Sequence, residues 1–436
     1  MPELRKLCEG AALLSLRNQD ALDLAAALAN DPPEGFLDAV PGARTLLLLY
    51  DPDVLDPARL DLSRRSRRPA PRMVRLQACY DGADLDEVAR ELGATREEVV
   101  RRHAEADHVV SFLGFAPGFA YMTGGFALPR LRTPRLRVPA GSLAIADGYT
   151  GIYPAATPGG WRLLGRVAAR MFEPGANPPA LLRPGDRVVF EPVGRLEETS
   201  ARAPVAMPSG PPLLRVLAPG AFTSVQGGPR YGLASSGVPA GGAMDLAALA
   251  AANRAAGNAP FAAALEITLA GPELEALQDV RMALGTEVQV LARGERLRTG
   301  TVRRGVRAYL AVEGGLSQAL PGEPVRALGP GDTLHRASGG PLPPGPRPSA
   351  APLRWGEPLI EVRAHRGPQW DFFASPEDFF DREYRVSPSS DRRGCASKAR
   401  RSRSRGDPTS RPKARLPARS RCPETGCPSC WGRTAR

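Results

Sequence analysis

Apolar positions in the first ninety residues follow more than one period. Residues 20–30 (DALDLAAALAN) carry apolar side chains at helical spacing, whereas residues 45–50 (TLLLLY) form a short continuous apolar run typical of a buried strand. Alternate positions from Val74 to Tyr80 are apolar, as in a strand with one buried face. The pattern therefore predicts a small unit that mixes helix and strand.

Two short helices are expected to complete this unit. Asp84 and Glu87 have the spacing of a helix N-cap and its N3 partner, and Gly93 stands where a C-terminal glycine cap belongs. Thr95 begins a second capping box, whose helix runs towards His103.

Beyond residue 109 the chain changes to short apolar segments separated by glycine and proline. The sequence contains 46 of each, and proline at that frequency is far above ordinary usage. Pro184 with Gly185, and the sequence GPGDTL at 329–334, are typical of type II turns that lead into strands. Short apolar segments separated by glycine and proline favour β-barrels or sandwiches over helical bundles.

Local composition predicts where the domains begin and end. Residues 198–212 are rich in Pro, Ala and Ser and predict a linker, and a proline-rich stretch at 339–352 separates a last β-type piece. We expect a small α+β domain at 1–105, a β-barrel at 106–197, the linker at 198–212, a second β-barrel at 213–338, the truncated start of a third at 353–394, and a disordered basic tail at 395–436.

Formal charge is concentrated in that tail. The chain has 58 Lys and Arg against 46 Asp and Glu, a net charge of +12, but residues 395–436 hold 12 of the basic and 2 of the acidic residues, which leaves +2 for residues 1–394. The body is nearly neutral, so we expect neither a nucleic-acid partner nor a membrane partner.

The tail at 395–436 resembles ordinary protein sequence only in a shifted reading frame. When its codons are taken as GC-rich and read one nucleotide earlier, CASKARR becomes VRLEGPA and CPETGCPSCWG becomes VPGDGLPIVLG, which are ordinary strand and turn sequences. We therefore expect the tail to be out of frame after Gly394. Cys422, Cys427 and Cys430 are then codon accidents and not metal ligands, and no metal site is expected.

Several signatures of known chemistry are missing. The three lysines, Lys6, Lys398 and Lys413, are not part of a G-x4-G-K-[ST] phosphate loop, and the sequence has no G-x-S-x-G nucleophile elbow. No apolar run reaches the roughly 18 residues that span a bilayer, and no signal-peptide core is present, so we expect a cytoplasmic protein.

The densest group of unusual residues follows His103. Residues 114–121 (GFAPGFAY) place two glycines and a proline among aromatic side chains, which suits a loop whose backbone amides approach a ligand in an aromatic pocket. Similar turns occur at 134–142, 150–154 and 158–161. The alternative is a set of barrel turns filled by aromatic side chains, with His103 a core residue and not a general base.

These motifs carry a family resemblance. FLGFAPGFAYM (112–122), TPRLRVPAGSLAIADGYTGIYP (133–154) and TPGGWRLLGR (157–166) resemble the B-subunit family of bacterial ATP-dependent 5-oxoprolinase, also described as allophanate hydrolase subunit 1 or a sporulation-kinase-inhibitor family. Residues 213–394 resemble the C subunit of the same system, through motifs that include TSVQGGPRYG, SSGVPAGGAMD and ALEITLAGP. Both families resemble the carboxyltransferase portion of biotin-dependent urea carboxylase.

The resemblance implies a mainly β fold, in which a small N-terminal α+β domain is followed by cyclophilin-like β-barrel domains. It implies a fused B and C component of 5-oxoprolinase that converts 5-oxo-L-proline to L-glutamate with a separate A subunit and is inactive without it. ATP with Mg2+ would be shared with that partner, and no covalent biotin is implied. The family's V-Q-D-x-G-R appears here as VQGGPR, without its aspartate, and His108 stands where the family usually has tyrosine.

Hydrolysis of a lactam needs an acid or base and donors for a carbonyl or phosphate oxygen. On the matching motifs, the expected acid–base residues are His103, Asp245 and Glu266. The residues expected to bind the small-molecule substrate are Gly114, Phe115, Pro117, Gly118, Phe119, Tyr121, Arg137, Thr150, Tyr153, Gly160, Trp161, Gln226 and Arg230. No residue stands out as a nucleophile.

Two other functions, and a loss of activity, stay open from the sequence. The chain could be a regulator that binds and inhibits a sensor histidine kinase, which would need a docking surface and no acid–base group. It could be the carboxyltransferase component of a urea carboxylase or allophanate hydrolase system, with the biotin carrier on another chain because no biotinylation lysine occurs here. The shifted tail could also mark a copy that has lost its activity.

Overall fold

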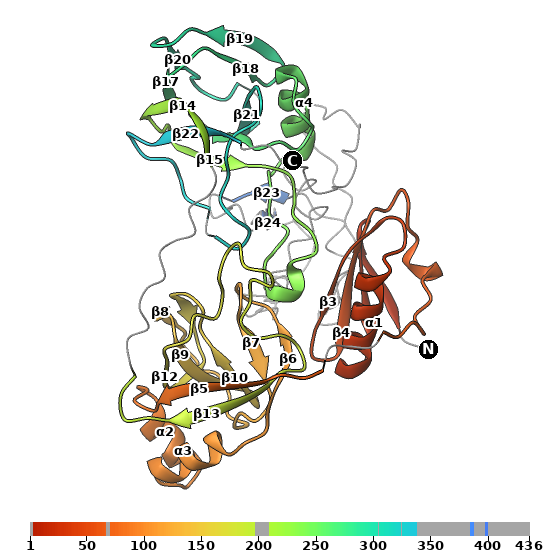
Figure 1. Ribbon diagram of the computed structural model, residues 1–436, viewed down its shortest axis with the longest axis vertical. Coiled ribbons are helices and arrows are strands. Elements are labelled where there is room, and N and C mark those ends of the chain that lie inside the picture. The colour runs from red at the N-terminus through yellow and green to blue at the C-terminus, as the bar shows by residue number, and fades with distance from the viewer. Residues whose placement is uncertain are drawn as a thin grey trace, which may run out of the picture.

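The computed structural model describes residues 3–66, 70–196, 209–303, 305–323, 325–337, 384–387 and 397–399. Most of them form three parts, which we call the N-terminal sheet (residues 4–50), the barrel (73–192) and the sandwich (209–337) (Figure 1). Residues 384–386 and 397–399 pair in a separate two-stranded sheet. Across these residues no helix is both long enough and apolar enough to cross a bilayer.

The N-terminal sheet has four strands in the order β1-β2-β4-β3, covered on one face by a helix. Its elements are β1 (Leu4–Cys8), β2 (Ala11–Ser15), α1 (Asn18–Asn30), β3 (Phe36–Pro41) and β4 (Thr45–Tyr50). Leu46 and Leu48 pack towards α1, whereas Leu47 and Leu49 pack on the opposite face. Because both faces are covered, β4 is apolar throughout, which explains the TLLLLY run.

The barrel is closed and has the strand order β10-β7-β6-β13-β5-β12-β9. Its strands are β5 (Met73–Cys79), β6 (His108–Leu113), β7 (Ala120–Met122), β9 (Ser142–Ala146), β10 (Tyr149–Ile152), β12 (Arg162–Val167) and β13 (Arg187–Pro192), with α2 (Leu85–Glu91) and α3 (Arg96–Ala104) between β5 and β6. β8 (Arg135–Val138) and β11 (Thr157–Gly159) pair separately, and the short helix η1 (Pro57–Arg59) precedes β5. β13 pairs with β5 in parallel and with β6 antiparallel.

The structure displaces the domain boundary expected at residue 105. β5 pairs with β12 and β13, so the barrel includes the strand and the two helices that the sequence analysis joined to the first unit. The period of a strand shows that it has a buried face but not which sheet it joins.

The predicted caps are confirmed with one exception. Thr95 accepts from the Glu98 amide, and Gly93 follows α2 with a φ of +61°. Asp84 precedes α2 but makes no cap with its side chain. Its carboxylate instead accepts from the Leu163 amide at 2.7 Å and pairs with Arg135 at 2.6 Å, and therefore links the start of α2 to the barrel wall.

The sandwich has two sheets around one apolar core. One sheet has the order β20-β17-β14-β22 and the other β15-β16-β21-β18-β19, with α4 packed on the second. The elements are β14 (Ser209–Ala218), β15 (Phe222–Gln226), η2 (Ala234–Ser236), α4 (Leu246–Ala256), β16 (Ala264–Thr268), β17 (Glu273–Ala276), β18 (Val280–Leu284), β19 (Glu287–Leu291), β20 (Arg296–Arg298), β21 (Arg307–Val312) and β22 (Thr333–Ala337).

The second expected barrel is therefore not a single closed sheet. The two sheets are joined by isolated bridges, Ala270 to Thr301 and Leu316 to Arg336, where a closed barrel would have continuous ladders. The two predicted type II turns are present, with Gly185 at a φ of +92° and Gly331 at +86°.

Some sequence predictions fall outside the described residues. Of the linker at 198–212, residues 209–212 belong to β14 and the others are not described. Of the segments at 353–394 and 395–436, the structure describes only β23 (Tyr384–Val386), Ser387 and β24 (Ser397–Ala399). The third barrel and the disordered, out-of-frame tail therefore stay predictions.

Candidate functional site

Residues 227–243, which we call the junction loop, connect β15 to α4 and contain η2. This loop lies between β3 and the β6–β7 end of the barrel (Figure 1). On the β3 side, Asp38 is 6% exposed and its carboxylate accepts from the amides of Gly232 at 2.8 Å and Ala234 at 3.2 Å. Burial raises the pKa of Asp38, and the bonds from backbone amides oppose this rise.

A second contact joins the junction loop to residues 114–119. Gly118 donates its amide hydrogen to the carbonyl of Ser236 at 2.9 Å. Gly237 has a φ of +79°, and a Cβ at this position would lie 2.5 Å from the Ala116 carbonyl oxygen, so the close approach requires glycine. The amides of Gly114 and Phe119 donate to carbonyls within their own loop. At least three amides that the sequence analysis offered to a ligand are therefore used inside the protein.

The aromatic residues expected around a ligand do gather in one cluster. The ring centroid of Phe119 lies 5.3 Å from that of Tyr153 and 5.3 Å from that of Trp161, and Tyr121 lies 5.4 Å from Trp161. Phe115 packs on the edge of Phe119 at 5.4 Å. Burial raises the pKa of Tyr153, which also accepts a hydrogen bond from the Trp161 amide. The rings fill one another's space, as the alternative interpretation predicts, and their binding of a ligand stays a prediction.

Two predicted polar residues lie at the start of the junction loop. Gln226 is buried at the end of β15 and donates to the Ser224 hydroxyl at 3.1 Å. Arg230 is partly buried, and its guanidinium donates to the Ala319 carbonyl at 2.9 Å. Burial lowers the pKa of Arg230 while the Glu323 carboxylate raises it, and an arginine so placed remains a cation at neutral pH.

Asp245 and Glu266 belong to one buried network beneath the end of the junction loop. The Glu266 carboxylate accepts from the Met244 amide at 2.7 Å and from the Tyr309 hydroxyl at 2.8 Å, and it lies 3.4 Å from the Arg307 guanidinium. The Tyr309 hydroxyl in turn accepts from the Asp245 amide at 2.8 Å. Burial, followed by the negative charge of Glu266, holds the pKa of Tyr309 well above its usual value.

The side chain of Asp245 has a local role in the same network. Its carboxylate caps α4 by accepting from the amide of Ala248 at 2.9 Å. Together, Asp245 and Glu266 fix the chain where the junction loop turns into α4. Each therefore has structural partners, and an acid–base role for either residue stays a prediction.

His103 and Thr150 are brought together, as the sequence analysis expects of site residues. His103 is fully buried, with its ring nitrogens 2.9 Å from the Tyr80 hydroxyl and 3.0 Å from the Thr150 hydroxyl. Its ring centroid lies 5.3 Å from that of Phe190. Burial and the nearby His108 hold the pKa of His103 well below its usual value, so the ring is neutral at neutral pH.

His108 lies beside His103, although the two residues are five positions apart in the sequence. The two ring centroids are 4.7 Å apart because α3 ends at Ala104 and the chain reverses into β6, which begins at His108. The ring nitrogens of His108 lie 2.8 Å from the Thr123 carbonyl and 2.7 Å from the His103 carbonyl. Burial lowers the pKa of His108, and these two acceptors oppose that shift.

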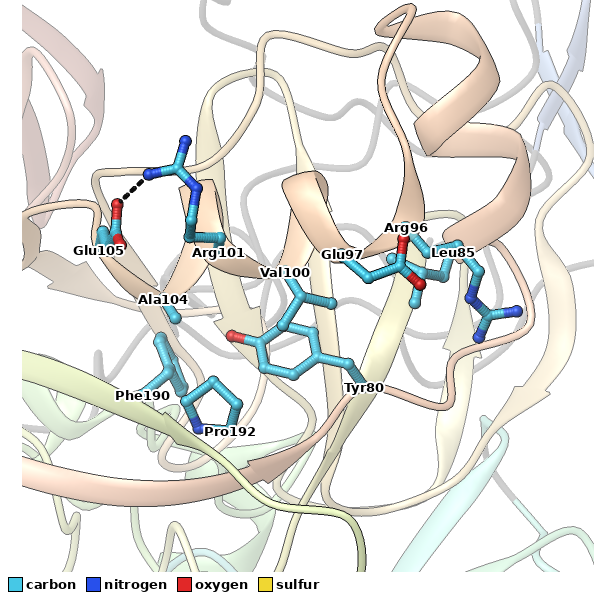
Figure 2. A pocket seen from close by; sticks show the side chains of 10 residues that line it. All are labelled: Tyr80, Leu85, Arg96, Glu97, Val100, Arg101, Ala104, Glu105, Phe190 and Pro192. Atoms are coloured by element: carbon cyan, nitrogen blue, oxygen red, sulfur yellow. Dashed lines mark hydrogen bonds and ion pairs between the residues drawn. The ribbon is translucent and has the colours of Figure 1, made fainter.

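The hollow beside α3 holds none of the predicted site residues. Its volume is about 660 Å3, and Tyr80 and Phe190 are part of its lining (Figure 2). Both of these rings also contact the ring of His103. Arg101 and Glu105 form an ion pair at its edge. The other lining residues are Leu85, Arg96, Glu97, Val100, Ala104 and Pro192. Tyr80, which holds His103, was missed as a candidate because it stands at the end of an ordinary alternating strand.

The predicted site residues thus fall into separate groups. One group gathers where the junction loop meets residues 114–119, the second is the Asp245–Glu266 network, and the third is the His103 cluster beside α3, at the end of the barrel away from the sandwich (Figure 1). Arg137 joins none of them, since it is exposed on β8. Within the described ranges, no cluster of three or more His, Cys, Asp or Glu could hold a metal ion.

Comparison with known proteins shows what this arrangement belongs to. Residues 5–182 match the family model of carboxyltransferase domain, subdomain C and D, and residues 236–415 match that of subdomain A and B. The chain is 37% identical over 190 residues to the 5-oxoprolinase B subunit of Bacillus subtilis. The matched region covers 38% of this chain and 79% of that protein. It is 31% identical over 217 residues to the 5-oxoprolinase C subunit of Escherichia coli, covering 42% of this chain and 67% of that protein.

The chain belongs to the carboxyltransferase-domain family of the 5-oxoprolinase B and C subunits. A solved structure, that of TTHA0988, is 35% identical and superposes with a TM-score of 0.74 over 89% of this chain and 86% of that one. The mainly β fold that the resemblance implied is confirmed. We call residues 1–197 the B-like half and residues 213–394 the C-like half. The subdomain A and B match extends to residue 415, beyond the point where a change of frame is predicted.

Proposed function

We propose that this chain is a fused B and C component of an ATP-dependent 5-oxoprolinase, which converts 5-oxo-L-proline to L-glutamate with a separate A subunit. The observation that carries the proposal is the junction. Within one chain, a loop of the C-like half is bonded to Asp38 and Gly118 of the B-like half. Two sequences whose relatives are the B and C subunits of 5-oxoprolinase are thus held in direct contact.

Arg230 is the residue best placed to recognise the substrate. 5-Oxoproline carries a carboxylate, and a guanidinium binds carboxylates through paired donors. Arg230 lies on the junction loop. Its guanidinium donates to the Ala319 carbonyl, and the fork carries further N–H donors. The aromatic cluster, which the junction loop approaches at Gly237 and Ala116, supplies an apolar wall for the ring of the substrate.

ATP, bound with Mg2+, supplies the activation of an otherwise unreactive lactam. The described residues form no acidic cluster suited to Mg2+ and show no P-loop lysine, so we assign its binding to the assembly with the A subunit and derive no step through it. In this chain, Arg230 orients the carboxylate of the substrate, and the aromatic side chains exclude water around it.

The test is ATP-dependent release of glutamate from 5-oxoproline by this chain mixed with an A subunit. The chain as given is compared with one whose reading frame is restored after Gly394, and each protein is also assayed alone and without ATP. We expect turnover that requires both ATP and the A subunit. Activity confined to the restored chain would also establish the change of frame. Two folded but inactive chains would refute the proposal, and parallel assays with urea and allophanate would then test the carboxyltransferase alternative.

A further inference from the structure

Asp38 is an unusual residue for the edge of a small sheet. It is 6% exposed, and the groups that lower its pKa are the backbone amides of Ala234, Gly232 and Ala39, with no cation among them. A buried carboxylate is costly unless hydrogen bonds satisfy it. Two of its three amide donors come from the other half of the chain, one of them 194 residues away in sequence. The position of this carboxylate is therefore explained by the junction loop and not by its own domain.

Apolar packing supports the same contact. The face of the N-terminal sheet opposite α1 is formed by Val40, Leu47 and Leu49 among others, and Tyr231 and Ala234 of the junction loop pack on it. The loop is thus the second layer over this sheet in the part of the chain that the structure describes. Burial of this face and the two charge-assisted hydrogen bonds hold the segment 231–234 in one place.

Backbone hydrogen bonds within the junction loop connect the segment 231–234 to the rest of the loop. The amide of Arg230 donates to the Ala240 carbonyl at 2.8 Å, and the amide of Ala243 donates to the Gly227 carbonyl at 2.9 Å. The loop is therefore closed on itself, and its segments cannot shift independently. Arg230 lies two residues before the first amide that Asp38 binds, so the position of its backbone depends on this segment.

We propose that Asp38 is a positioning residue, which fixes the junction loop so that Arg230 meets the substrate in the right place. The proposal rests on the function proposed above. Asp38 itself does not touch the substrate. Its role is to make the small N-terminal sheet part of a site that is otherwise formed by the barrel and the sandwich.

The test compares Asp38→Ala and Asp38→Asn in the full chain. Alanine removes both acceptors, whereas asparagine retains a carbonyl oxygen that can accept from Gly232 and Ala234. The matched control is Asp51→Ala, directly after β4, because the Asp51 carboxylate accepts a local bond, from the Asp53 amide at 3.1 Å. Hydrogen exchange of residues 228–238 reports the loop directly, and steady-state kinetics with the A subunit report its effect on the reaction.

In Asp38→Ala we expect exchange of these amides to become about tenfold faster and KM for 5-oxoproline to rise about tenfold, with a smaller change in kcat. Asp38→Asn should recover most of both effects, and Asp51→Ala should match the wild type. Unchanged exchange in Asp38→Ala would overturn the proposal, as would faster exchange with unchanged KM and kcat. If the wild type shows no 5-oxoprolinase activity, the proposed function fails, while the exchange data still decide whether Asp38 holds the loop.

Discussion

The ring of His103, near the end of α3, lies 4.7 Å from the ring of His108, at the start of β6, and both side chains are buried. Burial lowers the pKa of both residues below the ordinary value of 6.5. The unfolded chain therefore binds more protons than the folded protein once the pH falls below about 6.5. The free energy of unfolding should consequently decrease as the pH falls, and should level off above about pH 7.5.

We expect this decrease to be about 1.4 kcal/mol per pH unit for each histidine that is neutral when folded and protonated when unfolded. Urea unfolding between about pH 5.5 and 7.5 measures it. His103→Gln keeps a donor and an acceptor for Tyr80 and Thr150 but cannot titrate. The free energy of unfolding of this variant should therefore change with pH by about 1.4 kcal/mol per pH unit less than that of the wild type. An equal slope in this variant would show that His103 is not one of the groups responsible.

Gly237 provides a test of the junction that does not depend on activity. Alanine at this position places a Cβ against the Ala116 carbonyl and also requires a positive φ. Gly232 has a similar φ of +84° but open space around it, so Gly232→Ala carries the backbone strain alone. We expect Gly232→Ala to cost about 1 kcal/mol and Gly237→Ala at least twice that, measured by denaturant unfolding. Equal losses would mean that the contact with Ala116 is not maintained in solution.

The network around Glu266 leads to a prediction about stability. Tyr309→Phe removes the hydroxyl that donates to Glu266 and accepts from the Asp245 amide, and leaves the buried Glu266 carboxylate without this donor. The free energy of unfolding should fall by about 1–3 kcal/mol. If the network is structural, kcat per folded molecule should stay within a factor of two of wild type. A large loss of kcat with unchanged stability would instead support the acid–base role that the sequence suggested for Glu266.

The role proposed for Arg230 predicts an effect on substrate binding. Arg230→Lys keeps the positive charge but loses the planar fork, and should raise KM for 5-oxoproline about tenfold. Arg230→Ala should raise it further. Arg215→Ala is the control, because Arg215 is exposed on β14 and pairs with Glu275. A KM in Arg230→Ala equal to that of the wild type would remove this residue from the binding site.

Patterns within one element predicted this fold well. The TLLLLY run and the helix at 20–30 correspond to β4 and α1, and Thr95 caps α3 as expected. The sequence does not say what covers the second face of β4, because the answer is a loop nearly two hundred residues away. The same limit applies to Asp84, whose i to i+3 spacing with Glu87 suggests a cap although its carboxylate serves the barrel wall.

The candidate site shows the same division. The aromatic motifs predicted a cluster, and one is present. Grouping His103 with Asp245 and Glu266 was suggested by chemistry alone, and the structure gives these residues separate surroundings. Asp38 was not a candidate, because a single aspartate in a β-type segment resembles any solvent-facing residue until its distant partners are known.

During synthesis, the edge strand β3 is made well before the junction loop that later covers its sheet. Asp38 leaves the ribosome 194 residues before Gly232, an interval of about 10–40 s at typical elongation rates. During that time, the apolar face that Tyr231 and Ala234 later cover is open, and β3 is an unpaired edge. An inward-pointing charge on such an edge discourages pairing with another chain. The same carboxylate therefore serves the sheet in two ways, as a charge on an open edge before the loop exists and as the acceptor for the loop afterwards.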